Sequence, residues 1–480
     1  MRLKDFSFGF ASADFEASHE PDLLLRGFVD PMNLVPEVRT GKRWLFLGYK
    51  GSGKSALGEH LRLVSESDPE LFVHFVNIAD ISFSTFSQIL KGQFEPEARY
   101  PTVWSWLLLL FLLDSFAEDE SANITRDADF YAAIDALKQL GLLPKPNLSE
   151  AVNVTSDRSF SLKLTSVFGG FETTFKSTKT EQDLPFFATR LRMIARRFTT
   201  ANKHLLVIDG FDDLLRRGHL QYDALGALIY EVNRLNMDFA DGKAPVKIVV
   251  LCRTDLFERL PNANKNKIRQ NASVQIDWSG DTRDWRNSKL ISLINHRAAL
   301  STGGSVDVFE SYLPPTLGGG YNNKTQTRLL EHTRQVPRDM VMLFKSLQEH
   351  SGDDKMNETQ VFNALAAYSR DYLLPEIKDE LDGYISGEDI NTMFTVLGSL
   401  RKKSPSVDEL HQRSKELGAK PTFNLDAILS AMFECSAIGN LFLRGSTKTT
   451  FKYRNRHTTL NDRELLLVHE GLWTALKLRW

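Results

Sequence analysis

Short apolar runs alternate with longer helix-like segments from about residue 40 to about residue 280. The runs at residues 44–47, 71–77, 205–208 and 247–251 predict buried strands, and residues 273–277 predict a further strand. Between the strands, apolar residues recur at helical spacing, as in the set Leu225, Leu228, Ile229, Val232 and Leu235. This alternation predicts an α/β fold with a doubly wound, mainly parallel sheet, whose ligand site lies at the C-terminal ends of the strands.

A strongly apolar segment follows the second predicted strand. Residues 83–116 are rich in Leu, Phe and Trp and predict helices. Their most apolar part, residues 103–113, is shorter than the ~20 residues needed to span a bilayer. Asp114 follows it directly. We therefore expect a buried helix and no membrane segment.

An alternating pattern interrupts the predicted α/β domain at residues 159–176. Apolar and polar residues alternate there on both sides of Gly169 and Gly170, which predicts an inserted β-hairpin. Such a hairpin would either pack on the edge of the sheet or protrude as a contact arm. We expect inserted helices and this hairpin to occupy about residues 80–180, and an amphipathic helix to follow at residues 185–198.

The chain beyond Trp285 is dominated by helical patterns. One apolar stripe, formed by Met340, Leu343, Phe344 and Leu347, indicates a helical lid over residues 281–380 that follows the α/β domain predicted at residues 1–280. An acidic, glycine-containing stretch at residues 378–387 suggests a boundary. Three helix-like segments (390–400, 407–417 and 425–435) and two strand candidates (440–443 and 450–454) then predict a winged-helix domain at residues 381–480.

The composition is that of an ordinary globular protein. The 480 residues are 42% hydrophobic and 25% charged, and the net charge of −2 means that any nucleic-acid contact needs a local basic patch. Cys252 and Cys435 lie far apart and lack metal-ligand spacing. The first residues show no signal-peptide core. We expect a cytoplasmic, reduced and zinc-free protein.

Residues 48–55 match the pattern G-x-x-x-x-G-K-[ST], between a predicted strand and a predicted helix. A chance glycine turn is the alternative, and the flanking strand and helix disfavour it. Such a loop aims backbone N–H groups and the positive end of a helix dipole at phosphate. Lys54 would reach the β- and γ-phosphates, and Ser55 would ligate Mg²⁺. The phosphate-binding residues predicted from this loop are Gly48, Lys50, Gly51, Ser52, Gly53, Lys54, Ser55 and Ala56.

Acidic residues follow the apolar run at residues 205–208. Asp209 ends this predicted strand, which we expect beside the phosphate loop, where its carboxylate would bind Mg²⁺ together with Ser55. A second carboxylate three or four residues further on would orient or deprotonate the attacking water. Asp213 is the preferred residue and Asp212 the alternative, because two adjacent acids are not ranked by sequence.

Two arginines are candidate nucleotide sensors. Arg253 follows the apolar strand that ends at Cys252, where it would read the charge of the γ-phosphate, and a surface salt bridge is the alternative. Pro337 is suited to the start of a lid helix, so Arg338 would contact phosphate when the lid closes. An ordinary helix N-terminus is the alternative for Arg338.

Three motifs together resemble those of STAND-type ATPases, including NACHT proteins, and of related AAA+ and KAP proteins. Residues 205–215 (LLVIDGFDDLL) look like their second nucleotide-binding motif, residues 251–255 (LCRTD) like their arginine sensor, and residues 336–339 (VPRD) like their lid motif. The resemblance covers about residues 40–350 and implies a P-loop ATPase that uses ATP and Mg²⁺, with a lid and a winged helix. Asp213 stands where these families usually have Glu, which implies slow hydrolysis. The whole chain is more loosely similar to compact bacterial P-loop ATPases, some of them in defence loci.

These features lead to two functional hypotheses. The favoured one is a nucleotide-dependent switch, read by other copies of the chain or by a partner protein, with a role in bacterial defence or signalling. The alternative is a DNA-acting ATPase, similar to a replication initiator or a transposition helper. Its basic clusters are Arg444, Lys448, Lys452, Arg454 and Arg456, and Lys265, Lys267 and Arg269. For both clusters, a solvated face is the slightly preferred explanation. A small-molecule kinase is disfavoured, because we find no acceptor-binding motif.

Overall fold

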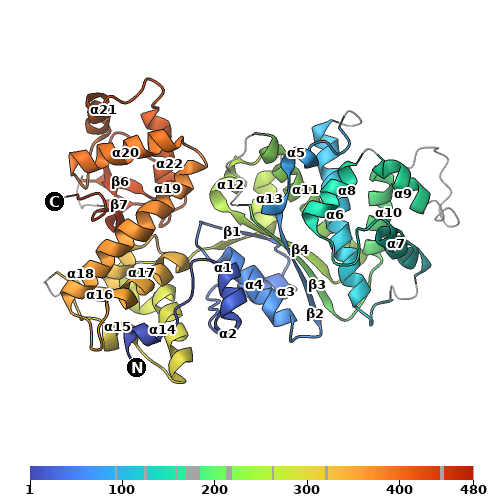
Figure 1. Cartoon of the computed structure of the whole chain (residues 1–480), viewed down its shortest axis with the longest axis horizontal. Helices are drawn as coiled ribbons and strands as arrows, with labels where there is room; N and C mark the ends of the chain where they lie inside the picture. Colours follow the sequence, from blue (N-terminus) through green and yellow to red (C-terminus); the bar gives the residue numbers. More distant parts are fainter. Residues whose placement is uncertain are drawn as a thin grey trace. The chain divides into compact units, whose positions relative to one another are not determined.

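The computed structural model describes residues 1–91, 95–123, 127–157, 159–168, 184–211, 219–261, 264–318, 323–443 and 448–478. The chain forms two compact units. The sheet unit contains Met32–Gly48 and Lys54–Ile276, and the C-terminal unit contains Met1–Pro31, Tyr49–Gly53 and Asp277–Trp480. Figure 1 shows the elements of both units. The predicted three-domain division of the chain stays a prediction.

The sheet unit is built on five parallel strands. They are β1 (Leu45–Gly48), β2 (Leu71–Asn77), β3 (Lys203–Asp209), β4 (Val246–Arg253) and β5 (Ser273–Ile276), in the spatial order β2-β3-β4-β1-β5. All five predicted strands are present within a few residues of the expected bounds. The predicted doubly wound, mainly parallel α/β sheet is therefore confirmed.

The position of β3 in the sheet differs from the prediction. We expected the strand that ends at Asp209 to lie beside the phosphate loop, but β4 lies between β1 and β3. The apolar patterns of β3 and β4 are equally suited to central strands, since both are buried along most of their length. The apolar pattern alone therefore does not show which of the two strands lies next to β1.

Helices α4 (Lys54–Ser65) and α6 (Pro96–Glu118) cover opposite faces of this sheet. A Cβ atom on Gly58 of α4 would lie 2.3 Å from the ring of Phe75, so α4 packs closely on that face. The preceding residue of β2, His74, lies with its Nε2 3.4 Å from Oε2 of Glu118 in α6. Successive residues of a strand point to opposite faces, so the two helices lie on different sides.

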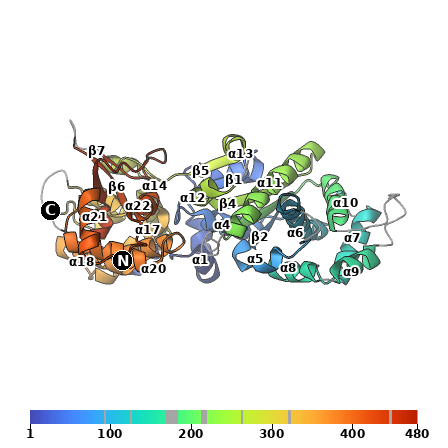
Figure 2. The ribbon, with the colours of Figure 1, turned by 90° about the horizontal axis from the view of Figure 1, so that it is seen from above.

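Helix α6 is long and apolar enough to cross a membrane by length and composition, but 83% of its apolar window is buried inside the protein. It contacts α10 (Leu184–Arg196) and α11 (His219–Gly242), and Trp104 Nε1 donates to the Ala224 carbonyl oxygen at 2.7 Å. Figure 1 and Figure 2 both show α7 to α10 gathered around α6. Packing in the core accounts for the apolar composition of α6. The other α-helices described in this unit are α3 (Leu34–Thr40), α5 (Phe83–Phe86), α7 (Ala128–Gln139), α8 (Leu148–Ser156), α9 (Phe160–Phe168), α12 (Thr254–Arg259) and α13 (Lys265–Ala272).

The predicted hairpin at residues 159–176 is wrong in its first half, where the chain forms helix α9 (Phe160–Phe168). Phe160 and Leu164 are buried, whereas Leu162 is 75% exposed. Residues four apart share a helix face, so the apolar residues follow helical spacing rather than the strand alternation that we inferred. The second half, with Gly169 and Gly170, lies outside the described residues.

The C-terminal unit is helical over the predicted lid region. Its helices are α14 (Lys289–Thr302), α15 (Val308–Tyr312), α16 (Thr325–His332), α17 (Pro337–His350) and α18 (Glu358–Ala367), followed by the π-helical turn η7 (Tyr368–Leu373) and α19 (Leu374–Asp382). The predicted stripe on α17 is buried. The N-terminal helices α1 (Ala13–His19) and α2 (Pro21–Arg26) belong to the same unit, where Arg297 of α14 and Glu16 form a buried ion pair of 2.7 Å.

The last hundred residues contain the three predicted helices, α20 (Gly387–Leu400), α21 (Val407–Glu416) and α22 (Leu425–Glu434). An antiparallel sheet follows, with β6 (Ile438–Phe442) between β7 (Lys448–Thr450) and β8 (Leu465–Val468). The predicted second strand is mostly absent, because the chain leaves the sheet after Thr450, and β8 was not predicted. The order of helices and strands agrees with a winged helix, which stays a prediction for this region.

Candidate functional site

The glycine-rich loop connects β1, which ends at Gly48, to α4, which begins at Lys54. Gly51 and Gly53 have φ angles of +80° and +89°, a conformation that side chains with a Cβ rarely adopt. Lys54 is buried, and its Nζ donates to the Gly48 carbonyl oxygen at 3.4 Å. The loop therefore turns back over the end of its own strand and holds a lysine amine there.

The residues of this loop fit a phosphate group. The Ser52 hydroxyl is buried and has no hydrogen-bond partner among the described residues. An unsatisfied buried polar group costs about 1–3 kcal/mol, which a ligand oxygen would recover. Half-buried Ser55 lies in the first turn of α4, at the positive end of the helix dipole. The buried amine, the unpaired hydroxyl and the two left-handed glycines together form a cradle suited to phosphate oxygens.

Two other predicted residues end strands at the same edge of the sheet. Gly48 of β1 pairs in register with Arg253 of β4, and Asp209 is the last residue of β3. Asp209 is 8% exposed. Gly210 after it has φ +88°, and a Cβ there would lie 1.8 Å from Oδ1 of Asn77, so this position requires glycine. The structure thus brings the ends of β1, β3 and β4 to the edge where the sequence placed the ligand site.

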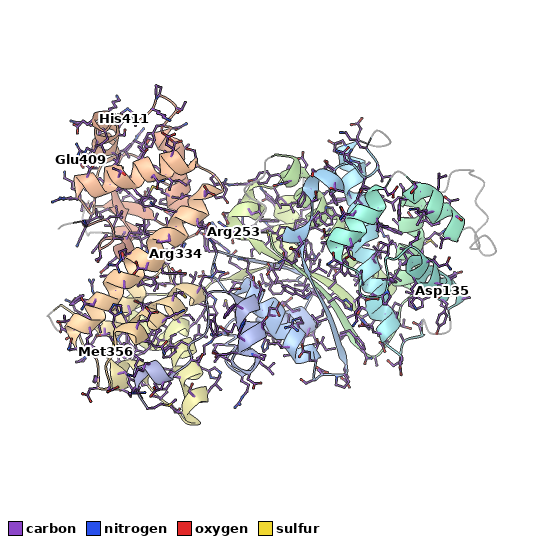
Figure 3. All side chains as sticks on the ribbon, in the orientation of Figure 1. Asp135, Arg253, Arg334, Met356, Glu409 and His411 are labelled. Carbon is purple, nitrogen blue, oxygen red and sulfur yellow. The ribbon has the colours of Figure 1, made fainter. Side chains whose placement is uncertain are left out.

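Arg253 forms a buried ion pair with Asp255, a residue that the sequence analysis did not select. Its Nε and Nη2 donate to the two carboxylate oxygens at 2.9 and 2.7 Å, and the arginine side chain is 3% exposed. The alternative prediction of a surface salt bridge is therefore wrong, because Arg253 does form an ion pair but the pair is buried. Figure 3 labels Arg253 near the end of β4. The position of Asp255 two residues after Arg253 was the feature of the sequence from which this ion pair could have been predicted.

The predicted water-activating acids, Asp212 and Asp213, lie outside the described residues. Their roles stay predictions.

The loop residues Tyr49–Gly53 belong to the C-terminal unit and are held there by three hydrogen bonds. The indole N–H of Trp278 donates to the Ser52 carbonyl oxygen at 2.9 Å, and the backbone N–H of Arg338 donates to the Gly51 carbonyl oxygen at 3.3 Å. The Tyr49 hydroxyl donates to the Lys452 carbonyl oxygen at 3.3 Å. The conformation of the loop is therefore tied to three distant parts of the chain, and nothing in the sequence marked Trp278 for this role.

An ion-pair cluster surrounds the loop lysine Lys50. Its Nζ lies 3.1 Å from Oε1 of Glu376 and 2.8 Å from Oδ2 of Asp379, and its side chain is 12% exposed. The same Glu376 oxygen lies 3.2 Å from Nη1 of Arg338. We call Lys50, Arg338, Glu376 and Asp379 the Glu376 cluster. The structure thus joins the predicted loop lysine and the predicted lid arginine through acids on α19 that no sequence spacing indicated.

A second charge network joins α17 to α19 behind this cluster. The Arg334 guanidinium bonds to Asp339 at 2.9 Å and to Glu380 at 2.8 Å, and the Tyr372 hydroxyl donates to Asp339 at 2.9 Å. Burial lowers the pKa of Arg334, but Asp339 and Glu380 outweigh it and hold this pKa well above its ordinary value. Figure 3 labels Arg334 among the helices of the C-terminal unit. These buried charges stabilise the junction between α17 and α19.

One further group of metal-ligand types lies on β2 and α6. Ligand atoms of His74, Asp114 and Glu118 lie within 4.8 Å of one another. His74 pairs with Glu118, and both Asp114 carboxylate oxygens accept from the Lys145 backbone N–H at 3.1 and 3.2 Å. These contacts account for the three side chains without a metal ion.

A parallel sheet in which a strand delivers a glycine-rich loop to the N-terminus of a helix, with an acid and an arginine ending strands at the same edge, is a P-loop NTPase fold. No protein-family model matches the chain, and no curated protein matches it. A solved structure, that of Cdc6p from Pyrobaculum aerophilum, matches over 98% of both chains, with 11% sequence identity and a TM-score of 0.25. A match at that TM-score carries no functional information.

Proposed function

We propose that this protein is an ATP-binding, Mg²⁺-dependent molecular switch of the STAND/AAA+ type that hydrolyses ATP slowly. The observation that supports this most is the anchoring of the loop residues Tyr49–Ser52 by α17, α19 and the C-terminal region of the same unit. A ligand shifts a conformational equilibrium only by interacting differently with the two states. Phosphate in this loop would act on residues that also hold the C-terminal helices.

Each predicted site residue has a role in this proposal. Lys54 and the backbone of the loop bind phosphate, and Ser55 and Asp209 hold Mg²⁺. Arg253 senses the γ-phosphate, with Asp255 as its counter-ion in the structure described here. Asp213, or its neighbour Asp212, orients the attacking water, and the shorter side chain relative to Glu makes hydrolysis slow. A bound Mg²⁺–ATP supplies the charge to which these side chains respond.

The state of the nucleotide would be read by other copies of the chain or by a partner protein. Bacterial defence or signalling is the setting that the motif resemblance suggests, in the cytoplasm. ATP and ADP should therefore give different oligomeric states or different protease sensitivity.

The test compares wild-type protein with Lys54→Ala and with the surface control Lys420→Ala, whose ion pair with Glu388 is exposed. ATP binding, ATP hydrolysis, limited proteolysis and sedimentation are measured without nucleotide, with ATP and with ADP. Lys54→Ala should lose ATP binding and every ATP-dependent difference, and Lys420→Ala should behave as wild type. Identical proteolysis and sedimentation of wild type with ATP and ADP would refute the switch.

A DNA-acting ATPase is the second candidate, supported by exposed Arg454 and Arg456 after β7. Other predicted basic residues are neutralised, since Lys452 pairs with Glu434 at 3.1 Å and Arg269 pairs with Glu258. Helix α22, the third helix of this region, contains acids and buried apolar residues but no Lys or Arg. Nonspecific DNA binding that weakens steeply with salt would support this candidate, and a flat salt dependence would exclude it.

A further inference from the structure

Glu376 contacts two cations, Lys50 and Arg338, that the sequence motifs predict to contact phosphate. Its Oε1 lies 3.1 Å from Nζ of Lys50 in the glycine-rich loop and 3.2 Å from Nη1 of Arg338 at the start of α17. The Glu376 side chain is 16% exposed, so water screens these contacts only in part. One carboxylate therefore contacts both cations in the described conformation.

We propose that Glu376 competes with the phosphates of a nucleoside triphosphate for Lys50 and Arg338. This inference rests on the proposed function and adds a named competitor to the same site. Arginine binds carboxylate and phosphate through the same fork of N–H donors, so one ligand replaces the other at Arg338. A triphosphate carries more charge and more acceptor oxygens than one carboxylate. When it is bound, it therefore displaces Glu376 from Lys50 and Arg338.

Displacement of Glu376 would act on α19. Glu376, Asp379 and Glu380 are three and four residues apart, so they share one face of this helix. Asp379 also contacts Lys50, whereas Glu380 contacts Arg334, which precedes α17. When phosphate takes Lys50 and Arg338, α19 loses the contacts of Glu376 and Asp379 with these two cations and keeps the ion pair of Glu380 with Arg334. Helix α20 follows α19 after four residues, so the change reaches the last hundred residues of the chain.

Thermodynamic linkage makes this effect reciprocal. If Glu376 lowers the affinity for ATP by some factor, ATP weakens the Glu376 contacts by the same factor. Coupling of this kind is typically about 5- to 150-fold. We expect the lower part of this range, about 5- to 10-fold, because the contacts are partly solvated.

The experiment uses the full chain and Glu376→Gln, which keeps the shape of the side chain and removes its charge. ATP affinity is measured by calorimetry, and accessibility of residues 374–387 is measured by limited proteolysis without nucleotide. Glu376→Gln should bind ATP about 5- to 10-fold more tightly than wild type. Without nucleotide, it should also show the cleavage pattern that wild type shows with ATP. Glu388→Gln, an exposed acid of the same unit, is the matched control and should equal wild type in both assays.

A double variant separates competition from a general loss of structure. In an Arg338→Ala background, Glu376→Gln should raise ATP affinity by a smaller factor, because one of the two contested cations is gone. Equal or weaker ATP binding by Glu376→Gln, or an undiminished gain in the Arg338→Ala background, would overturn the competition. Wild-type protein that binds no ATP would instead overturn the proposed function, so the two failures are distinguishable.

Discussion

At the scale of single residues, Gly51 illustrates why the phosphate-loop motif requires glycine in this chain. Its φ angle is +80°, and a Cβ would lie 3.1 Å from the Arg338 Cβ and 3.2 Å from a Val336 methyl carbon. The positive φ alone costs a residue with a Cβ roughly 1–2 kcal/mol. The close approach of α17 adds to this cost, so the motif glycine also serves packing in the C-terminal unit.

We therefore predict that Gly51→Ala lowers the free energy of unfolding by at least about 1 kcal/mol and weakens ATP binding. Gly304→Ala is the control, because a Cβ there meets nothing within 4 Å and the residue has no positive φ. Urea unfolding of both variants checks the first effect, and calorimetry with ATP checks the second. Equal stability of the two variants would show that the loop is not held as described.

The buried histidine His204 makes the sheet unit sensitive to acid. Burial lowers the pKa of His204 to about 4, although Asp119 opposes this shift through a contact of 3.1 Å with Nε2. The ring also lies 2.8 Å from the Ser115 hydroxyl and stacks on Phe72. Burial raises the pKa of Asp119, but hydrogen bonds from Thr200, Ser121 and His204 outweigh it and lower this pKa to about 2.

Since the unfolded chain binds a proton at His204 near pH 6.5 and the folded chain near pH 4, stability should fall as pH decreases between these values. The full loss for this group is about 3 kcal/mol. Asp119 loses its contribution only below about pH 4, because its folded pKa is about 2. Unfolding by urea at pH 7.5, 6 and 5, with wild type and His204→Asn, checks this prediction. The variant should have a shallower slope, and a slope equal to that of wild type would contradict the assignment.

At the scale of elements, α9 shows how one residue pattern supports two structures. Residues 160, 162 and 164 would share one face of a strand, but in the helix Phe160 and Leu164 face the core and Leu162 faces solvent. Phe160 packs edge-on against Trp106 of α6, with ring centroids 5.9 Å apart. The buried surface of α6 therefore selects the helix.

A pair of substitutions distinguishes the two structures. In the helix, Leu164→Glu places a charge in the core and should cost several kcal/mol, about 3 or more, whereas Leu162→Glu should change stability by less than about 0.5 kcal/mol. In a hairpin the two residues would share a face, and the two variants would have similar effects. Thermal or urea unfolding of both variants measures the difference.

The sequence predicted best those helices and strands for which the spacing of apolar residues showed both the type of element and its bounds. β3 and β4 appeared as long apolar runs, and α17 appeared as a stripe with Pro337 at its start. β8 was missed, because Leu465–Val468 is short and lies after a long polar stretch. The order of strands was not visible, because a parallel sheet leaves no local signal of which strands are neighbours.

The residues of the candidate site also fall into two groups, those that the sequence predicted and those that it did not. Gly51, Lys54 and Arg253 belong to local motifs, so sequence located them, and Asp209 marked the end of its strand. Trp278, Glu376 and Asp379 reach the loop only through the fold, across hundreds of residues of chain. Their functional interest comes from contacts that no spacing in the sequence encodes.

At the scale of the whole molecule, the N-terminal residues Met1–Pro31 are part of the unit that contains the C-terminus. Arg297 of α14 donates to both oxygens of Glu16 at 2.7 and 3.1 Å, and also to the Phe8 carbonyl oxygen at 2.7 Å. Both side chains of the pair are less than 9% exposed. The N-terminal residues and α14 therefore belong to a shared core.

We predict that Glu16→Gln destabilises this unit by about 3–5 kcal/mol, because it leaves the Arg297 charge buried without its carboxylate. Hydrogen exchange should show lost protection in α14 and α17 before β3 and β4 are affected. Glu388→Gln is again suitable as an exposed control. Uniform loss of protection across both units would contradict the assignment of residues 1–31 to the C-terminal unit.

The π-helical turn at Tyr368–Leu373 sets the rotational phase of everything that follows it. A π segment holds one more residue than the α-helical turn that it replaces, and each residue of an α-helix turns the chain by about 100°. If the same residues wound as a regular α-helix, without the π turn, each residue of α19 would be rotated by about 100° about the helix axis. Glu376 and Asp379 would then point away from Lys50, although none of the interacting residues would be lost. A change of winding in this one turn, far from the glycine-rich loop in sequence, would thus uncouple α19 from the loop.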